Sequence, residues 1–285
     1  MFQARGVSPL AAFQAAEGVF AGIAFVLMLL PVLVIDEHRY AESVPCDDGF
    51  FRSIGNVIRD RNFFRFTLSD FAYWISLYFI NNGLMYYITV LLGLPKEAYS
   101  SLFILMFLVS FLFYIPVNFI ARAVGRKRLL MIAFGIFAGL FVFCSLFGYL
   151  PLALMTQAVI ASLLAAVPLA IFGILPNAMV SDMAEAYAIE TGMHKAGVFF
   201  GFRTFMSKMG QSVGAIILPS VVMIGARGGA SGEVVGAQGV RLTAILALAF
   251  CVAGLVLLLL YDEKKVQRTL AQHHQETGAK SQTKT

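Results

Sequence analysis

Long apolar runs alternate with short polar connections along the whole chain. Each run approaches or exceeds the roughly 20 helical residues needed to cross about 30 Å of hydrocarbon. An isolated strand cannot satisfy its backbone hydrogen bonds in lipid, so the runs predict helices. About seven transmembrane helices are therefore expected in an all-α membrane protein, at residues 10–35, 69–94, 100–122, 129–149, 152–180, 197–225 and 240–261.

The polar connections divide the chain into four parts. We expect a lone transmembrane helix at 1–36, a cytoplasmic central loop at 37–67 and a six-helix transmembrane bundle at 68–262. The tail at 263–285 is rich in Gln, Thr, Lys and His, a composition that predicts disorder. The Gly-rich segment 225–239 predicts a flexible external loop between the last two spans.

Basic residues gather in alternate connections. Fifteen Lys and Arg lie in the connections after the first, third and fifth spans and in the tail, whereas four lie in the other connections. Positive loops stay in the cytoplasm, so this bias predicts an N-terminus outside and a cytoplasmic C-terminus in a plasma (inner) membrane. The net charge of +5 therefore reflects topology, and no nucleic-acid partner is expected.

The composition excludes most soluble functions. Charged residues make up 13% of the chain, about half the share in a soluble domain, and the mean hydropathy is +0.81. The sequence holds no phosphate-binding loop, no His pair at metal spacing and no nucleophile elbow, so neither an enzyme nor a cofactor is predicted. Cys46, Cys144 and Cys251 match no metal or redox spacing and are expected to be small buried apolar residues.

A lysine interrupts the sixth apolar span. Lys208 lies 11 residues into that span, so about 17 Å deep at about 1.5 Å per residue. A charge at that depth is costly unless it faces water or a partner, which favours a substrate cavity. The alternative is that Lys208 snorkels to the cytoplasmic interface, as is expected of Arg203, one turn nearer the cytoplasm. No carboxylate of the six-helix block lies at a comparable depth, so its expected partner is substrate, water or another chain.

Aromatic and amide side chains cluster in the second span. Tyr78 and Asn82 share a helical face, Trp74 joins them one turn back, and Asn81 is adjacent. Aromatic rings and amides suit the apolar faces and hydroxyls of a sugar. They suit ordinary helix packing equally well, and Trp74 also fits an aromatic belt at the membrane interface.

Two acids follow the fifth span at its cytoplasmic end. Asp182 and Glu185 are three residues apart on one helical face. They predict a gate in which the acids pair with nearby basic residues such as Arg203 or Lys195, and the alternative is a solvated helix end.

Three segments resemble one family of transporters. They resemble the glycoside–pentoside–hexuronide:cation symporters, the melibiose-permease-like branch of the major facilitator superfamily. Asp182 and Glu185 stand at the positions of that family's first two acids. The resemblance rests on Leu175 to Glu185 with the following Thr191-Gly192 and Gly197 to Phe200, on Ser207-Lys208-Met209-Gly210, and on the basic turn Gly125 to Leu130.

The resemblance spans most of 67–262 and implies helices six to twelve of a twelve-helix transporter. It implies cation-coupled transport of a sugar or related small solute by alternating access, here as a C-terminal half. Lys208 would contact the sugar and take part in coupling, and the acidic pair would act as a gate. The coupling cation, Na⁺ or H⁺, would bind in the five preceding helices, which this chain does not contain.

Four partners are considered, and two other functions stay open. The chain contacts the lipid bilayer and a small solute, and it could pair with a separate N-terminal half or with a second copy. One other interpretation is a truncated or inactive membrane fragment without transport of its own. The other is a lysophospholipid-type carrier, since Phe-rich walls suit acyl chains, whereas Trp74 and Tyr78 favour a sugar.

Overall fold

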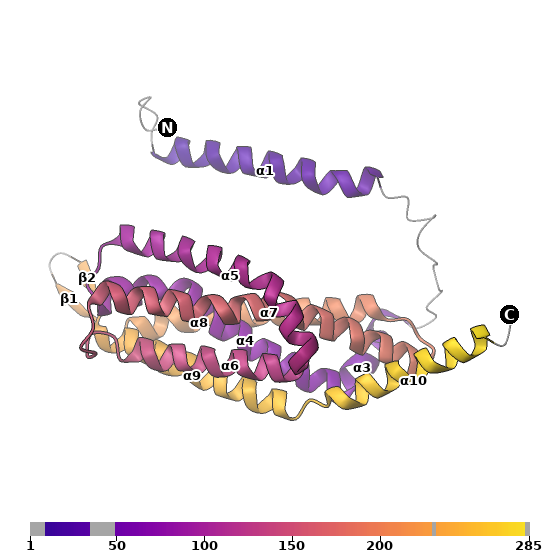
Figure 1. The fold of residues 1–285 in the computed structure, drawn as a ribbon. Helices are drawn as coiled ribbons and strands as arrows, with labels where there is room; N and C mark the ends of the chain where they lie inside the picture. The colour runs from indigo at the N-terminus through magenta and orange to yellow at the C-terminus, as the bar shows by residue number, and fades with distance from the viewer. Residues whose placement is uncertain (1–8, 35–48, 230–231, 283–285) are drawn as a thin grey trace. The chain divides into compact units, whose positions relative to one another are not determined.

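The computed structural model describes residues 9–34, 49–229 and 232–282, which are almost entirely helical. The chain forms two units, Met1–Cys46 and Asp47–Thr285. The first unit contains α1 (Pro9–Val34), and the second contains all the remaining elements (Figure 1).

Helix α1 is apolar apart from Gln14 and Glu17 and exposes its large side chains. Phe20, Met28 and Leu33 are 72%, 77% and 73% exposed. A helix that is hydrophobic on all sides requires lipid or a core around it, so α1 has the surface of a membrane span.

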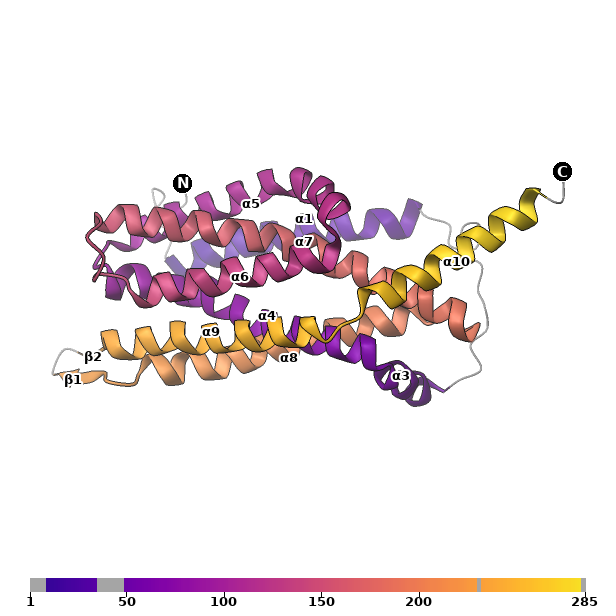
Figure 2. The ribbon, with the colours of Figure 1, turned by 60° about the horizontal axis from the view of Figure 1, so that its bottom comes forward.

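The second unit is a helical bundle with a small hairpin at one end. Its long helices lie roughly along one direction, and Figure 2 shows α4 between a group formed by α5, α6 and α7 and the pair α8 and α9. The elements are α3 (Phe50–Arg59), α4 (Arg61–Tyr86), a π-helical turn η2 (Tyr87–Leu91), α5 (Lys96–Val124), α6 (Arg126–Ser145), α7 (Leu154–Thr191), α8 (Ala196–Val222), β1 (Arg227–Gly229), β2 (Gly232–Val234), α9 (Ala237–Leu259) and α10 (Glu263–Gln282).

Six of the described helices are long and apolar enough to cross a membrane, namely α1 and α5 to α9. The predicted all-helical membrane fold is thereby confirmed. The remaining expected span, 69–94, corresponds to α4 and η2. Polar residues such as Asp70, Asn81 and Asn82 lower the hydropathy of α4, although 14 of its 26 residues are buried in the bundle. The crossing by α4 therefore stays a prediction.

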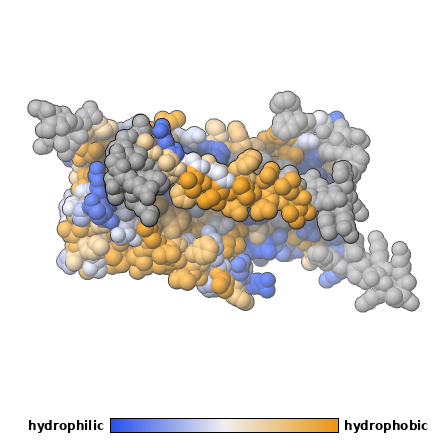
Figure 3. Space-filling view, turned by 90° about the horizontal axis from the view of Figure 1, so that it is seen from above, coloured by the Kyte–Doolittle hydropathy of each residue, from blue (hydrophilic) through white to orange (hydrophobic). Residues whose placement is uncertain are grey.

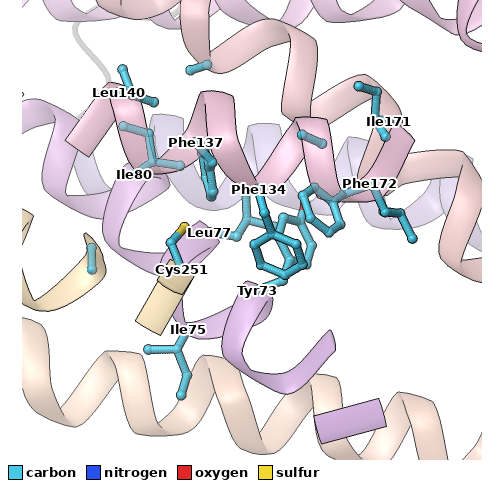
Figure 4. Packing of buried hydrophobic residues seen from close by; sticks show 14 of the residues in the cluster. Tyr73, Ile75, Leu77, Ile80, Phe134, Phe137, Leu140, Ile171, Phe172 and Cys251 are labelled. Atoms are coloured by element: carbon cyan, nitrogen blue, oxygen red, sulfur yellow. The ribbon is translucent and has the colours of Figure 1, made fainter. Parts of the chain in front are cut away.

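Aromatic packing joins α4, α6 and α7 in the core. Tyr73 stacks on Phe172 with ring centroids 3.7 Å apart, and Phe134 meets Phe172 edge-on at 4.8 Å (Figure 4). Helix α9 closes on the same region at Gly254, whose carbonyl accepts a 2.7 Å hydrogen bond from Ser69 Oγ. In lipid, helices associate through such close packing and interhelical hydrogen bonds.

The C-terminal tail differs from the prediction. It forms helix α10 up to Gln282 and packs against α7. Val266 and Leu270, one turn apart, give α10 an apolar stripe, and Glu190 of α7 accepts a hydrogen bond from Thr269 and forms an ion pair with Lys265 at 3.3 Å. Disorder was predicted from composition alone, which does not register an apolar pair at helical spacing.

The expected central loop and external loop are also partly ordered. The expected central loop contains α3. Helix α4 begins at Arg61 because the Asp60 side chain caps its first turn, accepting hydrogen bonds from Asn62 N at 2.7 Å and Phe63 N at 3.1 Å. In place of a flexible external loop, β1 and β2 pair antiparallel between α8 and α9.

Apolar side chains dominate the outer surface. On α5 the exposed fractions of Phe111, Leu112 and Ile115 exceed 70%, and Figure 3 shows hydrophobic residues exposed at the surface beside hydrophilic ones. Such a surface requires lipid around it. Cys144 and Cys251 are buried as predicted, whereas Cys46 lies outside the described residues.

Candidate functional site

Helices α4 and α8 pack closely because α8 presents two glycines one turn apart. A Cβ added at Gly210 would lie 3.0 Å from the Phe71 carbonyl oxygen and 3.0 Å from Trp74 Cβ. One added at Gly214 would lie 2.8 Å from Tyr78 Cβ. Small residues at this spacing let two helix backbones approach in a membrane. Trp74 and Tyr78 therefore lie against the helix that carries Lys208.

A buried ion pair joins these two helices. The side chains of Asp70 in α4 and Arg203 in α8 are 2% and 11% exposed. Arg203 Nη2 donates to Asp70 Oδ1 at 3.3 Å, and Nε lies 3.0 Å from Oδ2 without the alignment of a hydrogen bond. Arg203 therefore pairs with Asp70 and not with Asp182 or Glu185, the acids expected beside it, and its place at the membrane interface stays a prediction.

Two further residues extend this pair into a network. Trp74 Nε1 donates to Asp70 Oδ2 at 3.1 Å, and Arg203 Nη1 donates to Asn177 Oδ1 of α7 at 2.6 Å. The network thus connects α4, α7 and α8. The Trp74 indole packs edge-on against Tyr73 and bonds to Asp70, so its N–H points into the bundle, which differs from a belt residue that bonds to lipid headgroups.

Lys208 lies on the exposed side of α8. It shares that side with Thr204, Gln211 and Ser212, all within about one turn along the helix. Its ammonium forms no ion pair with any residue of the described part of the chain. The structure thus places Lys208 on a polar helix face, and its role in binding stays a prediction.

The amides of α4 occupy two different environments. Asn82 is exposed, and its Nδ2 donates to the carbonyl oxygen of Tyr78 at 3.2 Å. The side-chain oxygen of Asn81 is buried and has no hydrogen-bond partner within the described residues. A buried oxygen without a partner calls for a further donor such as a water molecule, and a solute would reach it only after neighbouring side chains move.

A polar stripe on α7 borders the same region. Asn177, Ser181 and Glu185 follow one another at one-turn intervals and are all exposed. Asn177 contacts Arg203 of α8, so this stripe meets the polar face of α8. Because exposed polar faces are costly in hydrocarbon, these stripes indicate a water-filled cavity or an interface within protein.

Asp182 pairs with a different basic residue from the one expected. Its Oδ2 accepts hydrogen bonds from Arg126 at the start of α6 and from Gln267 of α10, the latter at 3.1 Å. Glu263 of α10 accepts from the backbone N–H of Lys127 at 3.1 Å. The acid therefore ties together α6, α7 and α10 at the basic end of the bundle.

Glu185 lies beside one of its expected partners. It lines a cavity of about 470 Å³ together with Lys195 and His194. The two acids thus have different contacts, because Asp182 bonds to α6 and α10 whereas Glu185 lines the neighbouring cavity.

Sequence reasoning missed Asp70, Arg126 and Asn177. Asp70 was passed over because the expected span began at 69, which placed the acid at a helix end, whereas α4 begins eight residues earlier. The cap residue Asp60 was the signal that could have moved that boundary. Within the described residues, no group of three His, Cys, Asp or Glu side chains could hold a metal ion.

Comparison with known protein families gives one match. A family model described as MFS/sugar transport protein matches residues 4–262. None of the curated protein sequences compared with the chain matches it significantly.

Proposed function

Because the chain belongs to the MFS/sugar transport protein family, we propose that it forms the C-terminal half of a cation-coupled sugar transporter of the melibiose-permease-like branch. The chain is an integral membrane protein of a transporter family, and its family gives no reason to expect catalysis. The main support for a sugar transporter is the polar region formed by α4, α7 and α8. The Asp70–Arg203 pair joins α4 to α8 in this region, inside an otherwise apolar bundle.

In this proposal the solute lies against α4 and α8. The rings of Trp74 and Tyr78 cover the apolar faces of the sugar, and the amides of Asn81 and Asn82 bond to its hydroxyls. Lys208 contributes a cation with three donors and no acceptor, which suits hydroxyl or carboxylate oxygens. The unpaired oxygen of Asn81 supplies the acceptor that Lys208 lacks.

Alternating access would move this half against a second half around the solute. The Asp70–Arg203 pair links the sugar-facing Trp74 to α7 and α8, so a solute that shifts the indole also strains the contacts between helices. At the basic end of the bundle, the Arg126–Asp182 pair would act as a gate that opens and closes with the cycle. The coupling cation, Na⁺ or H⁺, would bind in the preceding half.

Uptake measurements test the proposal directly. The chain is expressed alone, with a tagged second copy, and with a separately encoded five-helix half, in cells that lack sugar uptake. Accumulation of labelled sugars is measured under imposed Na⁺ and H⁺ gradients. We expect gradient-dependent uptake only when a second half is present. Correct insertion without uptake in any combination would favour an inactive fragment, and uptake of lysophospholipids in place of sugars would favour a lipid carrier.

Replacing Lys208 with alanine is expected to abolish sugar uptake and to leave membrane insertion intact. The exposed ammonium supports no described ion pair, so its loss removes a solute contact and not a packing contact. Uptake and the amount of inserted protein are measured together, with Ser212→Ala on the same helix face as the control. Unchanged uptake in Lys208→Ala would remove Lys208 from the site.

Replacing Arg126 with glutamine is expected to open the gate without unfolding the bundle. Partly exposed ion pairs contribute only about 0–1 kcal/mol, so stability should change little. A cysteine introduced at the exposed Ser181 should then react several-fold faster with a membrane-impermeant thiol reagent. Arg128→Gln, in the same turn of α6, is the control. Equal labelling in the two variants would argue against a gate at Arg126.

A further inference from the structure

Helix α3 has the character of a helix that lies on a membrane surface. It is ten residues long and strongly amphipathic. Ile54, Val57 and Ile58 lie on one side, and Arg52 and Arg59 lie on the other. Val57 is fully buried, and α3 packs against α4 and α8, so the helix is fixed on the bundle.

A groove runs between α3 and the beginning of α8. Its volume is about 580 Å³, and every residue that lines it is apolar. Gly197 and Gly201 lie one turn apart on α8, and an added Cβ at either position would have no neighbour within 4 Å. Phe205, on the next turn, is 57% exposed. The lining residues are Ile54, Ile58, Gly197, Val198, Gly201, Phe202 and Phe205.

Basic residues lie next to this groove in the chain. Residues 52–65 contain four arginines, Arg52, Arg59, Arg61 and Arg65, and one acid, Asp60, which is engaged in capping α4. Arg59 and Arg61 are exposed. A basic cluster on an amphipathic helix beside a membrane span is typical of a site for anionic lipids.

We propose that the groove between α3 and α8 binds an anionic phospholipid. One acyl chain would lie over the two glycines, and the phosphate would lie at the junction of α3 and α4, where Arg61 begins α4 and the long Arg59 side chain extends from the polar side of α3. The apolar lining offers no hydrogen bond to a sugar, which excludes the transported solute as the occupant. The arginines favour an anionic lipid over a zwitterionic one, because both carry a phosphate but in the zwitterionic lipid a headgroup cation offsets its charge. This site does not depend on the proposed transport.

Lipid retention tests the proposal. The full chain is reconstituted in nanodiscs of phosphatidylcholine with and without phosphatidylglycerol, extracted in mild detergent, and the lipids that remain bound are counted by native mass spectrometry. We expect retained phosphatidylglycerol in preference to phosphatidylcholine. Equal retention of the two lipids would overturn the proposal.

Two variants separate the groove from the charge. Gly201→Leu fills the groove and keeps every arginine, and Gly139→Leu on the exposed side of α6, where an added Cβ also has no neighbour within 4 Å, is its control. The double variant Arg59→Gln/Arg61→Gln removes the charge, with Arg128→Gln as its control. Gly201→Leu and the arginine variant should each lower retention several-fold at unchanged helix content. If only the arginine variant lowers retention, the lipid lies on the surface and the groove site is wrong. If only Gly201→Leu lowers lipid retention, the proposed headgroup contact is wrong.

Discussion

Replacing Arg203 with alanine is expected to abolish uptake and to lower the free energy of unfolding by about 3–5 kcal/mol. The substitution leaves the Asp70 carboxylate, 2% exposed, without its cation inside the bundle. It also removes the contact from Arg203 to Asn177, and so loosens α8 from α7 as well as from α4. Thermal unfolding in detergent measures the loss of stability, and sugar uptake by the complete transporter measures the loss of function.

A double variant shows whether the loss comes from the unpaired charge. Asp70→Asn combined with Arg203→Gln replaces the ion pair by two neutral amides that can still bond to each other. Its stability should lie above that of Arg203→Ala, because no buried charge remains. If Arg203→Ala is as stable as the unchanged chain, the pair makes no net contribution, and Asp70 is then protonated or hydrated in that variant.

Most of the apolar helices could be predicted from the sequence to within a few residues, whereas α7 runs to Thr191 and was expected to end at 180. Helix α9 was expected at 240–261 and lies at Ala237–Leu259, and α6 was expected at 129–149 and lies at Arg126–Ser145. In these segments a single property, the length of an apolar run, decides the structure, because a single apolar segment in hydrocarbon satisfies its own backbone hydrogen bonds only as a helix. The prediction was weaker where helices lie partly in water. In α3, α10 and the first turns of α4, order depends on caps and short apolar stripes.

The candidate site could be predicted only in part, because most of its contacts depend on how the helices pack against one another. Trp74 and Tyr78 could be found because local helical spacing places them on one face. The Asp70–Arg203 pair joins residues 133 positions apart, and such a contact depends on how two helices cross. That crossing is set by Gly210 and Gly214, and nothing in the sequence of α8 alone shows which helix packs against them. Arg126 and Asp182 likewise meet only after α6 and α7 have packed.

Leucine at Gly214 is expected to force α4 away from α8 and to reduce uptake strongly. A Cβ at this position would lie 2.8 Å from Tyr78 Cβ and Cγ and 2.9 Å from Cδ1, closer than nonbonded carbon atoms approach one another. Overpacking of this kind typically costs about 1–3 kcal/mol, and here it displaces a ring proposed to contact the solute.

The decisive comparison restores the space on the opposite helix. Adding Tyr78→Gly to Gly214→Leu removes both the ring and the Cβ that the new side chain would strike, so the thermal stability of the double variant should recover in large part. Its uptake should stay low, since the proposed sugar-facing ring is gone. Gly139→Leu makes the same chemical change where α6 has open space, and it should alter neither property. Recovery of both stability and uptake in the double variant would show that Tyr78 spaces the helices and does not bind the solute. No recovery of stability would show that α8 packs on α4 in a different register.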